Sequence, residues 1–276
     1  MQYYRAVRRG FLVGLCTLGL IGCASTDHAS STPRHHAGIQ GAFDKPSPDY
    51  QKAALANVEL GLGYLGQGQI ARAKSKLTHA IRLAPALPEA RSGMAYFLEM
   101  TGDYKDAEKA HKKAIRLSKN QGASYNNYGA FLCRGSRFQE ADQAFHRALA
   151  DKDYPRTSEI YENAGLCAIR AQHKAAAINY LRTAIIRDPS AATALIELAY
   201  LSLQDGHLQD AKAYWQRYQK VALPTARSLS VGIHISKACH DDNAVASQAL
   251  RLKDLFEHSQ EYADYLRSER TEVKAQ

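Results

Sequence analysis

The sequence predicts an all-α protein in which about six helical hairpins stack into a right-handed superhelix. The first observation behind this prediction is a pattern of small residues with spacings of 34, 34, 36, 34 and 33 residues. The small positions are Gly61, Ala95, Gly129, Gly165, Ala199 and Gly232. An alanine follows each of them twelve residues later, at Ala73, Ala107, Ala141, Ala177, Ala211 and Ala244. Small residues at both places let two helices approach closely, so the repeated unit is a helical hairpin.

Turn residues and prolines are the second and third observations. Gly68, Gly102 and Gly206 each stand seven residues after a small position, where a first helix must end and the chain must reverse. Pro85 and Pro189 follow predicted second helices, and none of the eight prolines falls inside a predicted helix, where it would cost about 3 kcal/mol. These features are the signature of the tetratricopeptide repeat. The repeats are expected near residues 54–87, 88–121, 122–155, 158–191, 192–224 and 225–257, within a domain of residues 50–257.

The N-terminal residues 1–22 are predicted to be a lipoprotein signal peptide. Three arginines precede a short apolar run, and the run ends in Leu20-Ile21-Gly22-Cys23, which resembles a bacterial lipobox. The resemblance implies a covalent diacylglycerol and an acyl chain on Cys23, which would anchor the chain to a membrane. The alternatives are a secretory signal cut elsewhere and a transmembrane helix, but the run is shorter than the roughly 20 apolar residues that a span requires. Ala24 and Ser25, where an inner-membrane lipoprotein would carry aspartate, favour the outer membrane.

Residues 23–49 and 258–276 are predicted to lie outside the repeats. The first segment is rich in Ser, Thr, Pro, Gly, Ala and His, so it cannot bury a core and is expected to be a flexible tether spanning roughly 28 Å. Its histidines, His28, His35 and His36, are expected to be solvated rather than to bind a metal. The second segment is a basic C-terminal tail.

Two features inside the repeats break the pattern. The slot that faces each small residue holds Leu77, Phe145, Leu181 or Trp215 in four repeats, whereas His111 and Gln248 depart from it. A two-residue insertion within residues 151–158 is expected to change the rise between the third and fourth repeats and to kink the groove.

Composition argues against nucleic-acid binding and against catalysis. Without residues 1–22 the formal net charge falls from +9 to +6, and the chain has no run of five to eight basic residues. The sequence holds no HExxH, GxSxG, phosphate-binding loop or CxxC motif, so we expect neither an enzyme nor a cofactor, metal or small-molecule substrate. In Cys239-His240-Asp241-Asp242 the polar residues are expected to cap helices at a turn.

The three cysteines of the repeats are Cys133, Cys167 and Cys239. Their odd number requires at least one free thiol, and their positions within predicted helices favour small apolar core residues over a disulfide.

Polar residues of the first helices are the candidates for binding a partner in the concave groove. Asn127 and Asn163 share one slot of the repeat, and Arg134 and Arg170 share another. Carboxamides can bridge the main-chain N–H and C=O groups of a peptide, and guanidinium groups can bind its carboxylates. Asn126 and Glu162 flank the asparagine slot. Alternatively, these side chains simply solvate an empty groove.

The first repeat carries an apolar stripe instead, formed by Leu55, Val58, Leu62 and Leu65. Packing inside the core is the favoured interpretation. A part left exposed at the end of the superhelix would suit an amphipathic helix or an apolar strand of a partner.

Several segments resemble the outer-membrane lipoproteins of type IV pilus biogenesis, the PilF/PilW group that act as pilotins for the secretin. The matching segments are Asn126-Asn127-Tyr128-Gly129, Asp153-Tyr154-Pro155-Arg156-Thr157-Ser158, Glu162-Asn163-Ala164-Gly165-Leu166, Ala226-Arg227-Ser228-Leu229 and Leu252-Lys253-Asp254-Leu255-Phe256. The resemblance implies a lipid-anchored protein on the periplasmic face of the outer membrane. It would bind secretin subunits there and promote their localisation and multimerisation. The alternative is a tetratricopeptide lipoprotein that serves as a scaffold for peptidoglycan hydrolases or for outer-membrane protein assembly.

Overall fold

A computed structural model describes residues 48–275, and this part of the chain is helical with no strand. The helices are α1 (Pro48–Gly66), α2 (Ile70–Leu83), α3 (Pro88–Met100), α4 (Tyr104–Leu117), α5 (Gly122–Arg134), α6 (Phe138–Leu149), α7 (Thr157–Arg170), α8 (Lys174–Arg187), α9 (Ala192–Gln204), α10 (Leu208–Val221), α11 (Ala226–Ala238), α12 (Asp242–Phe256) and α13 (Gln260–Ala275). The all-α prediction is confirmed. The predicted signal peptide, Cys23 and most of the predicted tether lie outside the described residues, although Pro48 and Asp49 belong to α1.

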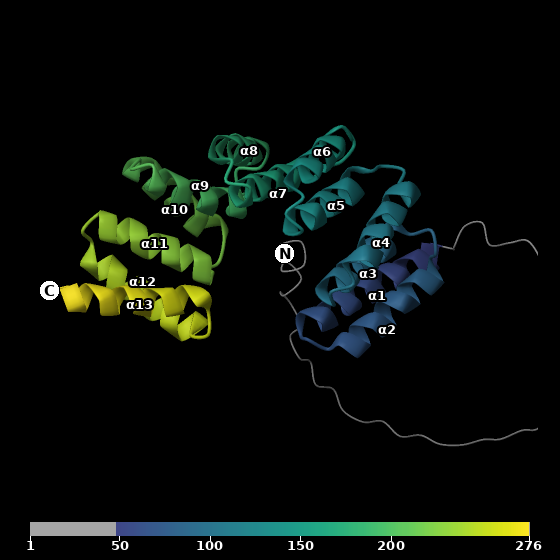
Figure 1. The fold of residues 1–276 in the computed structure, drawn as a ribbon, viewed down its shortest axis with the longest axis horizontal. Helices are drawn as coiled ribbons and strands as arrows, with labels where there is room; N and C mark the ends of the chain where they lie inside the picture. Colours follow the sequence, from purple (N-terminus) through teal and green to yellow (C-terminus); the bar gives the residue numbers. More distant parts are fainter. Residues whose placement is uncertain (1–47, 276) are drawn as a thin grey trace, which may run out of the picture.

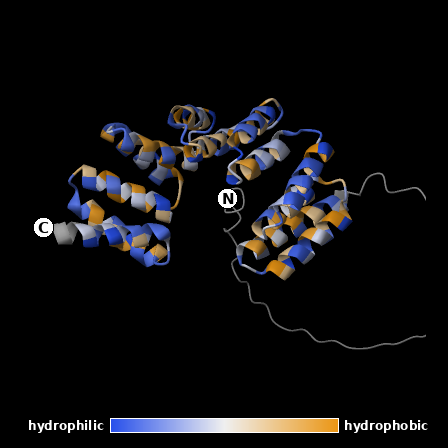
Figure 2. Cartoon of the chain, viewed as in Figure 1, coloured by the Kyte–Doolittle hydropathy of each residue, from blue (hydrophilic) through white to orange (hydrophobic). Residues whose placement is uncertain are grey.

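The helices form six hairpins in two layers. Each odd-numbered helix from α1 to α11 packs on the even-numbered helix that follows it, and the odd-numbered helices also contact one another in succession. Figure 1 shows the resulting arc, with α1–α4 at one end, α11–α13 at the other and α5–α9 between them. In Figure 2 each helix carries hydrophobic and hydrophilic residues side by side, as expected for helices that bury one face.

The small residues at the repeat positions allow this close packing. A Cβ atom added at Gly129 would lie 2.7 Å from Phe145 Cε1, and one added at Gly165 would lie 2.6 Å from Leu181 Cδ2. Such distances are far inside van der Waals contact, so any larger residue would force the two helices of the hairpin apart. The alanines twelve residues later are fully buried in the first five hairpins, while Ala244 is only partly buried.

The turn inside each hairpin requires a left-handed residue. Gly68, Gly102 and Gly206 have φ angles of 73°, 89° and 74°, as their sequence positions predicted. The equivalent positions of the other three hairpins are Ser136, Gln172 and His240, with φ angles of 60°, 61° and 55°. These residues accept a conformation that costs a non-glycine residue roughly 1 kcal/mol, because the turn geometry is common to all six hairpins. Asp241 caps α12 by accepting a hydrogen bond from Ala244 N at 2.9 Å, which confirms its predicted role.

The predicted C-terminal tail is largely the helix α13, which packs against α11 and α12. Tyr262 and Tyr265 of α13 cover the apolar cluster that includes Leu229 and Leu252, and Lys237 Nζ of α11 lies 2.8 Å from Glu269 Oε1. Helix α13 therefore covers this cluster of the last hairpin, although Leu250 and Leu255 of α12 remain exposed. Among residues 48–275, no helix combines the length and apolar composition that crossing a membrane requires.

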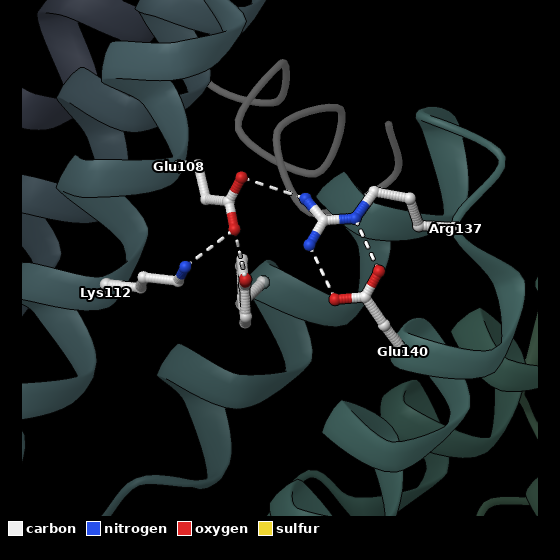
Figure 3. Close-up of polar contacts among 5 residues, drawn as sticks. Glu108, Lys112, Arg137 and Glu140 are labelled. Carbon is white, nitrogen blue, oxygen red and sulfur yellow. Dashed lines mark hydrogen bonds and ion pairs between the residues drawn. The ribbon is translucent and has the colours of Figure 1, made fainter.

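A network of charged side chains joins the second and third hairpins (Figure 3). Glu108 of α4 accepts hydrogen bonds from Arg137 Nη1 at 2.9 Å and from the Tyr128 hydroxyl at 2.8 Å, and its Oε1 lies 2.8 Å from Lys112 Nζ. Arg137 also binds both carboxylate oxygens of Glu140, at 2.7 and 2.6 Å. The hydrogen bonds from Arg137 and Lys112 lower the pKa of Glu108 to about 2, so this carboxylate stays charged at neutral pH.

The third and fourth hairpins are joined in a different way. Cys133 of α5 and Cys167 of α7 form a disulfide with a Cα–Cα distance of 5.7 Å, so the prediction that the cysteines are not paired was wrong for these two. Cys239 remains free. The cysteines are 34 residues apart, which is one repeat length, and neighbouring first helices touch. That separation was the available signal, because residues one repeat apart lie on adjacent helices.

The predicted insertion forms the connection 150–156, which is longer than the four-residue connections 84–87, 118–121, 188–191 and 222–225. Asp151 Oδ2 accepts a hydrogen bond from Gly122 N at the start of α5, at 2.8 Å. Tyr154 is buried, and a Cβ added at Gly122 would lie 2.8 Å from its ring. The longer connection therefore packs back on α5 and forms part of the groove wall.

Candidate functional site

The concave face contains a polar cavity of about 590 Å³ between α3, α5, α7 and the start of α9. Its lining includes Ser92, Tyr96, His111, Asn126, Asn127, Arg134, Arg156, Glu159, Glu162, Asn163 and Thr193. Most of these side chains come from first helices, so the prediction that first helices line the groove is confirmed. Four of the predicted partner-binding residues, Asn126, Asn127, Arg134 and Asn163, lie together here.

A more apolar cavity of about 600 Å³ adjoins the polar one. Leu55, Val58 and Leu62 of α1 line it, together with residues of α3 and α5. Both cavities share Ser92, Asn127 and Arg156, so they form one groove that is apolar at the first hairpin and polar further along. Val58 and Leu62 are 7 % and 8 % exposed and belong to the core, whereas Leu55 is 39 % exposed. The apolar stripe is therefore mostly core, as favoured, with an accessible edge at Leu55.

The asparagines of the groove differ in whether their side-chain amides are already hydrogen-bonded within the fold. Asn163 Nδ2 of α7 donates a hydrogen bond to Asn126 Oδ1 of α5 at 3.0 Å, and Asn126 is only 2 % exposed. This bond holds α5 against α7 and uses groups that were predicted to meet a peptide. Asn127 lines both cavities, and no other residue of the described part forms a hydrogen bond with its amide. Asn127 is therefore the asparagine that a partner can reach without breaking the fold.

The two arginines predicted to bind a partner also differ in how their guanidinium groups are already engaged. The guanidinium of Arg134 binds both oxygens of the Glu99 carboxylate, with Nη2 at 2.7 Å from Oε2, and lies 5.9 Å from the centre of the Tyr96 ring. Glu99 is 6 % exposed and Arg134 is 30 % exposed, so the carboxylate is nearly buried while the guanidinium remains partly accessible. Arg170 is exposed and lines neither cavity, and its Nη2 donates to the Arg134 carbonyl oxygen at 3.3 Å. A partner carboxylate would have to compete with Glu99 for Arg134, while Arg170 keeps further donors.

The carboxyl groups of α7 are held in different ways. Glu162 Oε1 accepts a hydrogen bond from Ala194 N at 3.0 Å, which pairs one of the N–H groups that have no intrahelical acceptor at the start of α9. Burial raises the pKa of Glu162, and this backbone bond opposes the rise. Burial also raises the pKa of Glu159, against the attraction of Arg156. Protonation of Glu159 and Glu162 as the pH falls therefore reduces the negative charge of the groove wall formed by α7.

His111 is the groove residue whose role the sequence did not predict. It is 2 % exposed, and neither ring nitrogen has a hydrogen-bond partner within the described residues. Its ring centre lies 5.0 Å from that of Phe131 and 5.9 Å from that of Tyr128. Burial, with the positive charge of Arg134, lowers the pKa of His111 to about 3, so the imidazole is neutral at physiological pH. The only sequence signal was the departure of His111 from the apolar repeat slot.

Comparisons with known proteins identify the repeats. Two family models described as tetratricopeptide repeat match residues 64–127 and 168–226. A "Type IV pilus assembly protein PilF" of Pseudomonas aeruginosa is 29 % identical over 257 residues, which cover 93 % of this chain and 97 % of that protein. An uncharacterized protein of Haemophilus influenzae is 35 % identical over 126 residues, which cover 46 % of this chain and 70 % of that protein.

Solved structures show the same relationship. The structure of Pseudomonas aeruginosa PilF has a TM-score of 0.64 and 29 % identity, covering 80 % of this chain and 99 % of that one. The structure of PilW, described as a widely conserved type IV pilus biogenesis factor, has a TM-score of 0.62 and 26 % identity, covering 77 % of this chain and 98 % of that one. The similarity thus spans nearly the whole length of both relatives.

Proposed function

Because this chain is a tetratricopeptide-repeat protein of the PilF/PilW type, we propose that it acts in type IV pilus biogenesis as a secretin pilotin. In this role it binds secretin subunits in the periplasm and promotes their localisation and multimerisation in the outer membrane. The observation that carries the proposal is the groove: a continuous concave surface with an apolar end and a polar middle, formed by consecutive first helices. Similarity to PilF and PilW supplies the process in which such a groove would work.

Recognition in the groove would combine two kinds of contact. The accessible edge at Leu55 offers apolar area, whose burial contributes about 25 cal/mol per Å². The side-chain amide of Asn127 in the groove and the exposed guanidinium of Arg170 beside Arg134 offer hydrogen bonds for the main chain or carboxylates of the bound segment. The protein would make or break no covalent bond, so its action is binding and transport rather than catalysis.

Membrane attachment is part of the same proposal and rests on the lipobox-like sequence that ends at Cys23. Acyl chains on Cys23 would hold the protein at the outer membrane, and the segment before α1 would set how far the groove can reach. The lipid would thus determine where a bound secretin subunit is delivered, while the repeats determine what is bound.

The test compares membranes from a deletion strain with membranes from strains restored with the native or the Cys23→Ala protein. Samples are run without boiling and blotted for heat-resistant secretin multimers. Loss of multimers on deletion, with restoration only by the native protein, is the expected result. Normal and correctly located multimers in the deletion strain would contradict the proposal and favour a scaffold for peptidoglycan hydrolases or outer-membrane protein assembly.

A second test addresses the groove itself. Asn127→Ala should weaken secretin binding without lowering helix content, because its amide has no structural partner. Asn179→Ala, an exposed amide on α8 of the opposite layer, is the matched control and should bind normally. Equal binding by both variants and the native chain would place recognition outside the polar groove.

A further inference from the structure

His111 occupies a position that is apolar in four of the six hairpins. The equivalent side chains are Leu77, Phe145, Leu181 and Trp215, and three of these are fully buried against the small residue of their own first helix. The remaining polar case is Gln248, which differs from His111 in two ways. Its Nε2 donates to Ser236 Oγ at 3.0 Å, although its Oε1 has no partner within residues 48–275, and it lines neither groove cavity.

An imidazole is a costly choice for such a position. A buried polar group without a hydrogen bond destabilises a fold by about 1–3 kcal/mol, and leucine would fill the same slot without that cost. Both nitrogens of His111 lack a partner within residues 48–275, although the side chain is 2 % exposed. A cost of this kind persists in a fold when the group serves a purpose outside the packing.

The surroundings of the ring indicate what it could bind. It lines the polar cavity together with Ser92 of α3 and Asn126 of α5, and because both ring nitrogens are buried, a bound group must shift a neighbouring side chain to reach them. Tyr128 and Phe131 of α5 flank the ring, and the nearby charged groups are Arg134 of α5, which is paired with Glu99 of α3, and Glu108 of its own helix. A neutral imidazole offers one donor and one acceptor.

The charges around the ring select against a charged ligand. An ammonium group entering the cavity would be repelled by Arg134, and a carboxylate binding Arg134 would have to displace Glu99, which already engages that guanidinium. An uncharged group meets neither obstacle. Hydroxyl and carboxamide groups also both donate and accept, so they match either tautomer of the imidazole.

We propose that His111 is a specificity-determining residue of the groove, which hydrogen-bonds an uncharged polar side chain, a hydroxyl or a carboxamide, of the bound protein segment. This inference rests on the proposed function and names the chemistry of the segment that the groove recognises. It also accounts for an unpartnered imidazole where four of the other five hairpins place an apolar side chain.

The experiment compares His111→Leu with Gln248→Leu in the full mature chain. Overlapping synthetic peptides that cover the secretin sequence are titrated against both variants and the native protein, and urea unfolding is measured in parallel. His111→Leu should raise the midpoint of unfolding and weaken the best peptide about tenfold, the loss expected for one buried hydrogen bond. Gln248→Leu should bind as the native chain does. His111→Gln, which keeps a donor and an acceptor, should retain most of the affinity.

The peptide side of the contact is tested by replacing each Ser, Thr, Asn and Gln of the bound peptide with Ala. One replacement should weaken binding to the native chain and have no effect on His111→Leu, since both changes remove the same bond. Native-like affinity of His111→Leu would overturn the inference and leave the pilotin proposal standing. Failure of every peptide and of the intact secretin to bind the native chain would overturn both.

Discussion

The junction between the second and third hairpins and the junction between the third and fourth use the same helix packing but different chemistry. The first is held by ion pairs, Glu108 with Arg137 on one side and Glu99 with Arg134 on the other. The second is held by the Cys133–Cys167 disulfide and by the Asn126–Asn163 hydrogen bond, and its connection, residues 150–156, is longer. Ion pairs respond to salt and pH, whereas a disulfide responds to redox conditions. The groove is therefore fixed covalently at the junction where the repeat spacing is irregular.

The difference has a reason in the geometry of repeat proteins. Each hairpin buries its apolar face only against its neighbours, so the stability of the array is a sum of hairpin and interface contributions. The insertion leaves the packing at its interface intact, since α7 contacts both α5 and α6. The disulfide adds a covalent link between the first helices on each side, at the position where the polar cavity lies.

The largest expected effect comes from removing the disulfide. Cys133→Ala with Cys167→Ala should lower the free energy of unfolding by about 4 kcal/mol, the value for a closed loop of this length. Unfolding should also become broader, because the two halves of the array lose their coupling. Urea titration followed by circular dichroism measures both. Reduction of the native chain should reproduce the result and Cys239→Ala should not; an unchanged transition would show that the disulfide contributes little.

The next effect concerns the ion pair between the nearly buried Glu99 and the partly exposed Arg134. Arg134→Ala leaves the Glu99 carboxylate without its cation at 6 % exposure and should cost about 3 kcal/mol. The double change Arg134→Met with Glu99→Gln removes both charges and should recover most of that loss. Chemical denaturation of the two variants measures both changes in the free energy of unfolding. Equal stability of the single variant and the native chain would mean that water reaches Glu99 in solution.

A smaller effect belongs to the long connection of the second junction. Asp151→Ala removes the side chain that accepts a hydrogen bond from Gly122 N at the start of α5 and should cost about 1 kcal/mol, as for other helix caps. Asp153→Ala, in the same connection, is the control. Thermal unfolding should give Asp151→Ala a lower melting temperature than Asp153→Ala. Identical melting temperatures would contradict the capping role of Asp151.

The smallest effect is the pH dependence of the exposed network. The pKa of Glu108 is lowered from 4.5 to about 2 in the fold, so its contribution is present above pH 4.5 and is lost as the pH falls toward 2. For a network this open to solvent the contribution should be below about 1 kcal/mol and should shrink in 1 M salt. Glu108→Gln should abolish the corresponding slope in urea unfolding between pH 4.5 and 2. A slope that survives the substitution would belong to other carboxyl groups.

Sequence reasoning recovered the elements that depend on short-range chemistry. The period of small residues determined the hairpins, and Gly68, Gly102 and Gly206 marked turns because a left-handed residue is required there. It also placed Asn127 and Arg134 in one groove, since the first helices of the hairpins line the concave face. The resemblance to PilF and PilW, based on a few segments, agrees with the comparisons over nearly the whole chain.

Only the tertiary structure decided how those residues are used. Asn126 binds Asn163 and Arg134 binds Glu99, so three predicted partner-binding residues serve the fold, while Asn127 stays available. The sequence did not reveal that Cys133 and Cys167 form a disulfide. Nor did it reveal that His111 lacks a hydrogen-bond partner within residues 48–275, and both have the same physical reason. Contacts between residues about one repeat apart depend on the rise and rotation between hairpins, and the sequence period gives the number of hairpins but not those two quantities.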